Sequence, residues 1–447
     1  MYKSGFAPLL RRGIKGEVFL FLLFFTSSAF SQEITKGEVY TYARKVVDTM
    51  TSQSMHGRGY INYGTKIAAN YIKSEYTKAG LKTFGKEYYQ SFSFPINTFP
   101  SEMSVSIGSP LVCGKDYIVR GDCGSVKGEF PLERIVVKDL AGNKKELKSF
   151  SKRDLSNIFI IIDKQGADLK DERTKQLAEA LQNNTCKAKG IIELEETKLT
   201  GDFSMEAQSY PALTILRNSI PPDAKTISLD IVNERISSYP SQNVIGYVEG
   251  SQYPDSFVVF SAHYDHLGQM GRSVYFPGAN DNASGCAMLL NLVKYYSMPE
   301  HKPKCSVVFM AFGGEEVGLL GSRYYTEHPL FPLKNIKFLL NMDIMGTGED
   351  GITVVNGTLF KNEFEKLKEI NTANSYIQDV KIRGKAANSD HYFFSENGVK
   401  AFFIYTMGGI KAYHDIYDRS ETLPLNEFED LFKLITKFGD YLQSVNQ

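Results

Sequence analysis

The chain has 447 residues, with 51 Lys and Arg against 51 Asp and Glu, and 42% of its residues are hydrophobic. This is an ordinary globular composition, and the chain is long enough for one large core and a second, smaller unit. The formal net charge of zero argues against nucleic acid as a ligand, because nucleic-acid-binding domains usually carry an excess of basic residues.

The N-terminus has the pattern of a secretory signal peptide. Basic residues precede the short apolar run 18–25 (VFLFLLFF), and small residues follow at Ala29 and Ser31. This run is far shorter than the roughly 20 apolar residues of a membrane-spanning helix, and no cysteine follows it directly as a lipid acceptor. We therefore expect residues 1–31 to be a signal peptide and the protein to be exported, periplasmic or extracellular, without a stable membrane anchor.

Three segments follow this leader. Amphipathic helical patterns such as GTKIAANYIKSEYTKAGL predict an N-terminal helical part of the catalytic domain at 32–97. Short strand-like runs, glycines and charged turns predict an inserted β-rich α+β domain at 98–238, where NIFIIIDK and KGIIELE flank a polar helical stretch. We expect the remaining residues, 239–447, to form the main domain together with 32–97.

In this last segment, apolar strand-like runs alternate with amphipathic helical stretches. The strand-like runs include SFVVFSAH, KCSVVFMAF, NIKFLLNMD and VKAFFIYTM, and helical patterns include ASGCAMLLNLVKYYS, a helix from about Val317 to Glu327, and a C-terminal helix from Leu425. This alternation predicts an α/β domain with a central, mostly parallel mixed sheet flanked by helices.

Five cysteines are compatible with an oxidising compartment. Cys113 and Cys123 are ten positions apart in a Gly-rich segment and could pair across a hairpin. Cys286 and Cys305 lie in apolar runs and are expected to be buried thiols, and Cys186 has no evident partner. No two cysteines have the short spacing of a thiolate zinc site.

Polar residues gather at the carboxyl ends of the strand-like runs, where open α/β sheets bind their ligands. His263 and Asp265 end FVVFSAHYD, Glu315 and Glu316 end VVFMAFGGEE, and Asp343 ends FLLNMD; Asp281 precedes a helix, and His414 follows AFFIYTM. Any one of these residues alone is more often structural than functional. Their joint placement predicts a metal site.

The residue types favour zinc. Imidazole and carboxylate ligands suit Zn²⁺ or a similar divalent metal, whereas Ca²⁺ and Mg²⁺ prefer shells of oxygen only. A catalytic zinc needs three protein ligands and an open position. Five candidates are enough for two metals if one carboxylate bridges them, an arrangement used for hydrolysis; they are His263, Asp281, Glu316, Asp343 and His414.

The motifs SAHYDHLG, PGANDNASG, FGGEEVGLLGS, NMDIMG, SDHYFF and YHDIYD, in this order, resemble those of the co-catalytic zinc aminopeptidases of peptidase family M28. The resemblance covers most of residues 240–445 and implies the zinc-exopeptidase fold. The segment 98–238 resembles, less specifically, a protease-associated insert, and a lid or substrate-selecting role and a merely stabilising role remain open for it.

The resemblance also implies roles for individual residues. His263 and Glu316 would hold one zinc, Asp343 and His414 the other, and Asp281 would bridge the two. Glu315 would be the general base, and Asp265 would accept the second ring N–H of His263. Tyr413 resembles a tyrosine that supports the oxyanion in some members and is absent from others; Asp390 and His391 are assigned only to the pocket region. The Asp281–Asn282 peptide would be cis.

We therefore expect a zinc-dependent aminopeptidase that acts on peptide substrates. A carboxypeptidase on a related site is an alternative. A glutaminyl cyclase is another, although such enzymes use one zinc in a tryptophan-lined pocket and this chain has no Trp. A receptor-like relative that has lost its ligands is the least favoured, because every ligand position is filled here.

Overall fold

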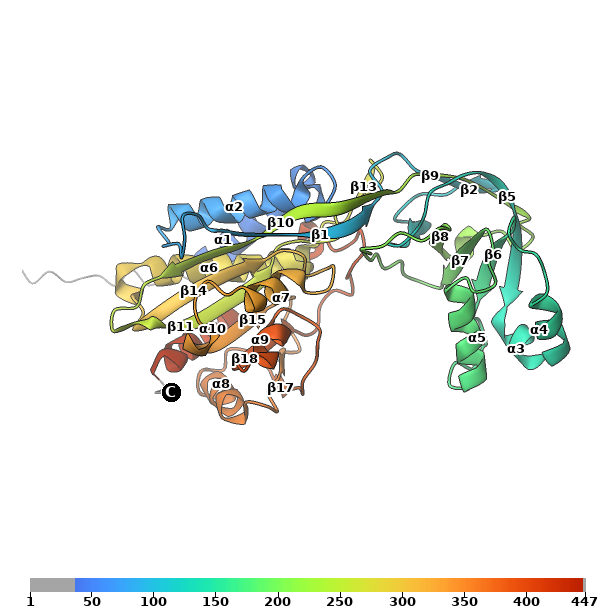
Figure 1. The fold of residues 1–447 in the computed structure, drawn as a ribbon. Helices are drawn as coiled ribbons and strands as arrows, with labels where there is room; N and C mark the ends of the chain where they lie inside the picture. The colour runs from blue at the N-terminus through green and yellow to red at the C-terminus, as the bar shows by residue number, and fades with distance from the viewer. Residues whose placement is uncertain (1–36, 445–447) are drawn as a thin grey trace, which may run out of the picture. The chain divides into compact units, whose positions relative to one another are not determined.

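The computed structural model describes residues 37–444, so the expected signal peptide at 1–31 lies outside the described residues. Within 37–444, no helix is long and apolar enough to cross a membrane. Figure 1 shows the arrangement of the helices and strands.

The larger sheet has eight strands in the order β1-β10-β14-β11-β15-β18-β16-β17. Its four central strands, β14, β11, β15 and β18, are parallel to one another, and the outer neighbours β10 and β16 run antiparallel to them. The sheet is therefore mixed, with a parallel centre, as the sequence predicted. The bounds of its strands are β1 Tyr89–Thr98, β10 Glu234–Val248, β11 Tyr253–His263, β14 Cys305–Phe312, β15 Ile336–Met342, β16 Ile352–Val355, β17 Val380–Ile382 and β18 Ala401–Thr406.

Helices cover both faces of this sheet (Figure 1). One face packs against α1 (Glu38–Met50), α2 (Gly64–Lys78), α6 (Gly285–Ser297), α8 (Lys361–Asn374) and α10 (Phe428–Ser444) around the largest apolar core. The other face packs against α7 (Leu320–Glu327) and α9 (His391–Glu396). Because both faces are covered, a central strand such as β14 is buried along its whole length, which explains its continuous apolar sequence.

A second eight-stranded sheet lies between β1 and β10 in the chain, in the order β3-β2-β9-β5-β6-β7-β8-β4. The chain leaves the larger sheet through β1 and returns to it through β10, and these two strands are paired antiparallel. The parallel strands β5, β6 and β7 and the helices α3, α4 and α5 share a small apolar core. The bounds are β2 Ser104–Ile107, β3 Ser109–Pro110, β4 Tyr117–Val119, β5 Val126–Val136, α3 Val137–Gly142, α4 Lys144–Phe150, β6 Phe159–Asp163, α5 Glu172–Gln182, β7 Gly190–Glu195, β8 Ala212–Leu216 and β9 Thr226–Ile231.

Two expectations differ from the structure. Cys113 and Cys123, whose spacing suggested that they could pair, are free thiols in the structure. Cys123 is buried in the insert core, where its thiol donates to the Gly124 carbonyl oxygen at 3.3 Å. The helix expected from Val317 begins at Leu320, because Gly318 (φ 104°) and Leu319 (φ 61°) have left-handed backbones that no α-helix continues through.

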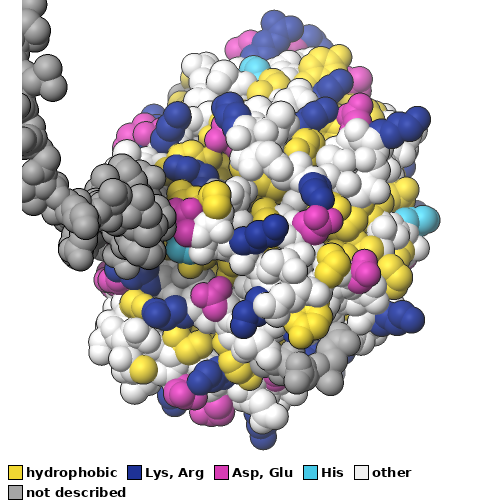
Figure 2. Space-filling view, turned by 90° about the vertical axis from the view of Figure 1, so that its left-hand side faces the viewer, with side chains coloured by type: hydrophobic (Ala, Val, Ile, Leu, Met, Phe, Trp, Pro, Cys, Tyr) yellow, Lys and Arg dark blue, Asp and Glu magenta, His cyan; other side chains and the backbone are white. Residues whose placement is uncertain are grey.

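The face of the molecule drawn in Figure 2 carries basic and acidic side chains in alternation, with apolar side chains scattered between them.

Candidate active site

The carboxyl ends of the central parallel strands bring together all five residues expected to bind metal. His263 is the last residue of β11, and Glu316 and Asp343 follow β14 and β15. Asp281 precedes α6, and His414 lies on the loop after β18. Their ligand-type atoms form groups within which all atoms lie within 4.8 Å of one another. The parallel sheet explains this convergence, since neighbouring parallel strands end at the same edge.

The first group contains His263, Asp281 and Asp343, all buried. The Nε2 atom of His263 lies 3.3 Å from Oδ1 of Asp281 and 3.3 Å from Oδ1 of Asp343. The Oδ1 atom of Asp343 is buried and has no hydrogen-bond partner. The other oxygen of Asp343 accepts a hydrogen bond of 2.9 Å from the Ser389 hydroxyl, which fixes the carboxylate with its free oxygen toward the imidazole.

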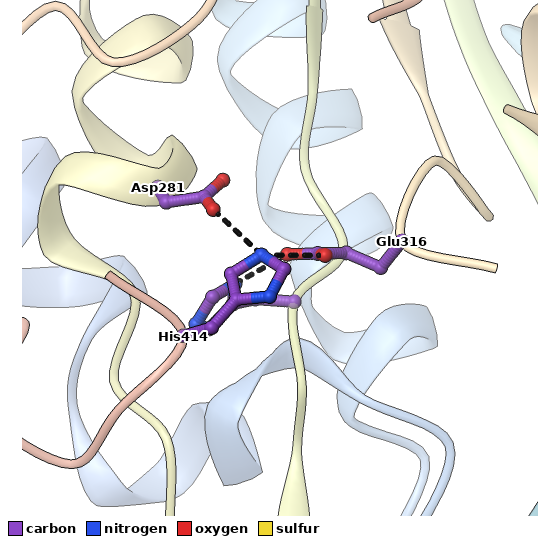
Figure 3. Close-up of side chains that lie close together, drawn as sticks. Asp281, Glu316 and His414 are labelled. Carbon is purple, nitrogen blue, oxygen red and sulfur yellow. Dashed lines mark hydrogen bonds and ion pairs between the residues drawn. The ribbon is translucent and has the colours of Figure 1, made fainter. Parts of the chain in front are cut away.

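The second group contains His266, Asp281, Glu316 and His414, the last three of which are drawn in Figure 3. The Nε2 atom of His414 lies 3.0 Å from Oδ2 of Asp281 and 3.0 Å from Oε2 of Glu316. The two oxygens of Asp281 therefore face the two groups separately, which is the arrangement that a bridging carboxylate requires.

The shortest contacts differ from the expected pairing of ligands, although ligand-type atoms of His263, Glu315 and Glu316 also lie within 4.8 Å of one another. His263 was expected to share a zinc with Glu316, and His414 with Asp343, but the structure places His263 beside Asp343 and His414 beside Glu316. The reason is that β11 and β15 are adjacent parallel strands, so their ends meet. His414 comes from a loop, whose course the order of motifs in the sequence does not specify.

The adjacent glutamates of the FGGEE motif lie in a turn that is hydrogen-bonded to the side chain of Asp265. The Asp265 carboxylate accepts hydrogen bonds from the backbone N–H groups of Glu315 (3.2 Å) and Glu316 (3.4 Å). It also accepts the hydroxyl of Tyr60 at 2.8 Å. The turn allows both glutamate side chains to face the site, although in a strand they would point to opposite faces.

Asp265 was also expected to accept the second ring N–H of His263, and this expectation is wrong. Nδ1 of His263 lies 3.2 Å from the backbone carbonyl oxygen of Asp265 and 3.8 Å from the nearest carboxylate oxygen. The carboxylate is engaged by Tyr60 and the glutamate turn instead, so the main chain of Asp265 orients the imidazole.

The buried charges of the site compensate one another. Burial lowers the pKa of His414, but the Glu316 and Asp281 carboxylates outweigh this effect and raise it to about 11. The pKa of His263 is likewise raised above its usual value, because Glu315, Asp343 and Asp281 outweigh its burial. In the metal-free protein both imidazoles are therefore cationic, in the position where a divalent cation would neutralise the same carboxylates.

The residues present fit zinc. Each group supplies at least one imidazole nitrogen and two carboxylate oxygens, which is enough for a catalytic zinc site with three protein ligands and an open position. Oδ1 of Asp343 faces the imidazole of His263 at 3.3 Å and is not held by the Ser389 hydroxyl, so it is placed as a metal ligand.

The remaining expected residues lie around the two groups. Glu315 is buried beside them, with Oε2 3.9 Å from Nε2 of His263. Tyr413 is about half exposed and stacks on His414, with ring centroids 4.0 Å apart. Asp390 is buried, and its burial and the nearby carboxylates raise its pKa to about 7; burial also lowers the pKa of His391 to about 4. The expected cis peptide between Asp281 and Asn282 is present.

Two charged residues that bind the backbone of the site loops were not predicted from the sequence. Arg58 is completely buried and donates to the backbone carbonyls of five residues, namely Met50, Tyr264, Pro277, Gly278 and Asp281. Asp418 accepts the backbone N–H groups of Asn280 and Asp281. Arg58 lies in GRGY and Asp418 in YHDIYD, but nothing in either stretch distinguishes a charge that binds main-chain atoms from one on the surface.

Comparison with known proteins gives one family. Residues 243–439 match the model of Peptidase family M28. Aminopeptidase YwaD of Bacillus subtilis is 34% identical over 165 residues, which are 36% of this chain and 34% of that protein. A "Probable zinc metalloprotease" of Pyrenophora teres is 35% identical over 127 residues, 27% of each chain. The matches thus span about a third or less of the curated relatives' length.

Solved structures share the fold over a longer stretch. The zinc aminopeptidase BSAP from Bacillus subtilis aligns with a TM-score of 0.66 at 20% identity, over 89% of this chain and 94% of that one. A peptidase M28 precursor from Shewanella amazonensis aligns with a TM-score of 0.67 at 18% identity, over 91% and 94%. Because these alignments include the insert as well as the larger sheet, the whole two-sheet architecture is shared.

Proposed function

Since residues 243–439 belong to peptidase family M28, we propose that the chain is an exported di-zinc exopeptidase that removes N-terminal residues from peptides. The observation that carries this proposal is the pair of histidine–carboxylate groups that share Asp281. A chain that needed only one metal would not require the second imidazole at the same carboxylate.

In this proposal His263, Asp281 and Asp343 hold one zinc, and Asp281, Glu316 and His414 hold the other. The bound metals would polarise the scissile carbonyl and lower the pKa of a bound water. Asp281 would be the one ligand common to both metals, because its two oxygens face His263 and His414 separately. Ser389, Asp418 and Arg58 hold the ligands and their loops in place.

Glu315 acts as the general base. Its carboxylate lies at the edge of the first group, 3.9 Å from His263, and is farther from that imidazole than Asp281 and Asp343 are. Burial, together with the negative charge of Glu316, raises the pKa of Glu315 in the metal-free protein. A carboxylate with a raised pKa accepts a proton from the attacking water more readily and can return it to the departing amine.

Tyr413 is placed to support the oxyanion. Burial of its hydroxyl and the surrounding carboxylates raise its pKa far above the usual value for tyrosine, so the hydroxyl keeps its proton at neutral pH. A protonated hydroxyl can donate a hydrogen bond to the negative oxygen that develops on the peptide carbonyl.

The experiment that tests this proposal measures metal content and specificity together. The purified protein should contain two zinc ions per chain and cleave aminoacyl chromogenic substrates, with activity lost to a chelator and restored by zinc. Cleavage of N-blocked peptides from the other end would show a carboxypeptidase. One zinc with cyclisation of N-terminal glutamine would show a cyclase, and absence of zinc binding would refute the enzyme reading.

Export is a separate part of the proposal and rests on the sequence of residues 1–31 alone. The mature protein should begin at or near Gln32. N-terminal sequencing of protein recovered outside the cytoplasm tests this, and a sequence that starts at Met1 would contradict it.

A further inference from the structure

A third imidazole, that of His266, is a member of the second group but is not one of the ligands proposed above. His266 lies three residues after His263, has no exposed surface, and places Nδ1 2.6 Å from Oε1 of Glu316. The other oxygen of the same carboxylate, Oε2, lies 3.0 Å from Nε2 of His414. The two oxygens of Glu316 thus face two different imidazoles.

The ring of His266 is fixed by its surroundings. Its backbone N–H donates to the carbonyl oxygen of Arg58, and its edge packs on His414, with ring centroids 5.7 Å apart and planes at 70°. Gly278 leaves the space for the ring, because a Cβ at that position would lie 2.3 Å from Cδ2 of His266. The ring is therefore packed closely against the backbone of the loop that carries Asp281.

The two nitrogens of the ring have different environments. Nδ1 contacts a carboxylate oxygen, which can only accept, so Nδ1 carries the proton. Nε2 is buried and makes no hydrogen bond within the described residues. The contact with Glu316 is thus the only hydrogen bond of this side chain in the described structure.

We propose that His266 is a positioning residue that occupies Oε1 of Glu316, so that Glu316 offers only Oε2 to the metal shared with Asp281 and His414. This inference rests on the proposed di-zinc function. Without His266, the Glu316 carboxylate could rotate or bind through both oxygens, and the open position at that metal would be lost. Partners of this kind typically contribute 10–100-fold to metal affinity.

A rival reading makes His266 a direct ligand, because one of its ring nitrogens lies within 4.8 Å of the ligand atoms of Asp281, Glu316 and His414. Substitutions that replace only one of the two ring nitrogens of His266 can distinguish a positioning residue from a direct ligand. The amide nitrogen of Asn can take the place of Nδ1, whereas that of Gln takes the place of Nε2. His266→Asn therefore keeps the donor to Glu316, His266→Gln moves it away, and His266→Phe keeps only the ring shape.

The test measures zinc affinity by competition with a chromogenic chelator, starting from the metal-free full-length mature protein. We expect the wild type to bind two zinc ions, and His266→Gln and His266→Phe to bind one of the two 10–100-fold more weakly. His266→Asn should stay within a few-fold of the wild type. X-ray absorption of the zinc-loaded wild type should show one imidazole per zinc on average.

The outcomes distinguish this inference from the proposed function. A wild type without two zinc ions refutes the function itself. Wild-type affinity in His266→Phe overturns the positioning role while the function stands. If His266→Asn is as weak as His266→Phe, or if absorption shows more than one imidazole per zinc, His266 is a ligand and the inference is wrong. Thermal unfolding of the metal-free variants identifies one that has failed to fold, in which case the comparison of Asn with Gln decides.

Discussion

The adjacent glutamates allow the sharpest test of the site, because one substitution should remove a base and the other a ligand. Glu315→Gln and Glu316→Gln have the same shape change and lie in the same turn. Asp265 holds that turn through the backbone N–H groups of both residues, so neither substitution disturbs it. Differences between the two variants therefore report on the side chains.

The expected magnitudes follow from where the two carboxylates point. Oε2 of Glu315 lies 3.9 Å from Nε2 of His263, farther than Asp343 at 3.3 Å, so the loss of this carboxylate should leave both zinc ions bound. It should lower kcat by 10²–10⁴-fold, which corresponds to roughly 2.7–5.4 kcal/mol of transition-state stabilisation. Glu316 lies 3.0 Å from His414, so Glu316→Gln should lose zinc from the group that contains His414 and keep it at His263 and Asp343.

Zinc content after gel filtration, measured beside kcat, checks both expectations. Excess zinc should partly restore Glu316→Gln and leave Glu315→Gln unchanged. Equal zinc loss in the two variants, or turnover near the wild-type value in Glu315→Gln, would refute the assignment of the pair. Loss of zinc from the His263 group in Glu316→Gln would refute the grouping drawn from the structure.

Three further predictions concern the scaffold and the metals. Arg58→Met removes five buried hydrogen bonds to carbonyls and should destabilise the metal-free protein by about 3–5 kcal/mol in denaturant unfolding; a change below about 1 kcal/mol would contradict this. In the insert, hydrogen bonds from Arg217 lower the pKa of Asp163 to about 2. Because the pKa of Asp163 is lower in the folded than in the unfolded protein, where it is near 3.9, this carboxylate stabilises the fold above pH 3.9 and loses that effect as the pH falls toward 2. Asp163→Asn should therefore lower the free energy of unfolding by up to about 2.5 kcal/mol at neutral pH. Between about pH 4 and 2 the free energy of unfolding of the variant should depend less on pH than that of the wild type. Chelation should lower the unfolding temperature as well as the activity, because a metal bound by residues from separate segments stabilises only the folded chain. An unfolding temperature that does not change after chelation would argue against bound metal.

The sequence predicted the parallel centre of the larger sheet because buried parallel strands have a simple signature. Runs such as Cys305–Phe312 are apolar throughout, and the acids that follow them mark the edge where ligands bind. The long antiparallel pair of β1 and β10 was not predicted, because the paired residues lie more than 130 positions apart in the chain. Local patterns carry no information on such a pairing.

The sequence predicted which residues come together at the candidate site, but not which of them contact one another. The five expected metal-binding residues converge as expected, but their grouping depends on the course of the His414 loop, which tertiary contacts decide. His266 was visible as a second histidine in SAHYDHLG, yet only the 2.6 Å contact with Glu316 distinguishes it from a buried structural histidine. Arg58 had no signal, since its partners are backbone carbonyls, which every residue has.

The insert completes the support of the site through one of its segments. The backbone N–H of Gly201 donates to the carbonyl oxygen of His414 at 2.8 Å, and Nζ of Lys198 lies 3.1 Å from the Asp415 carboxylate on the same loop. Phe203 packs on Tyr60 with ring centroids 4.7 Å apart, and Tyr60 in turn donates to Asp265 beneath the glutamate turn. The segment therefore contacts the supports of His414 and of the glutamate pair alike. A domain that stabilised only its own fold would need neither contact, so removal of the insert should disturb zinc binding as well as access of the substrate.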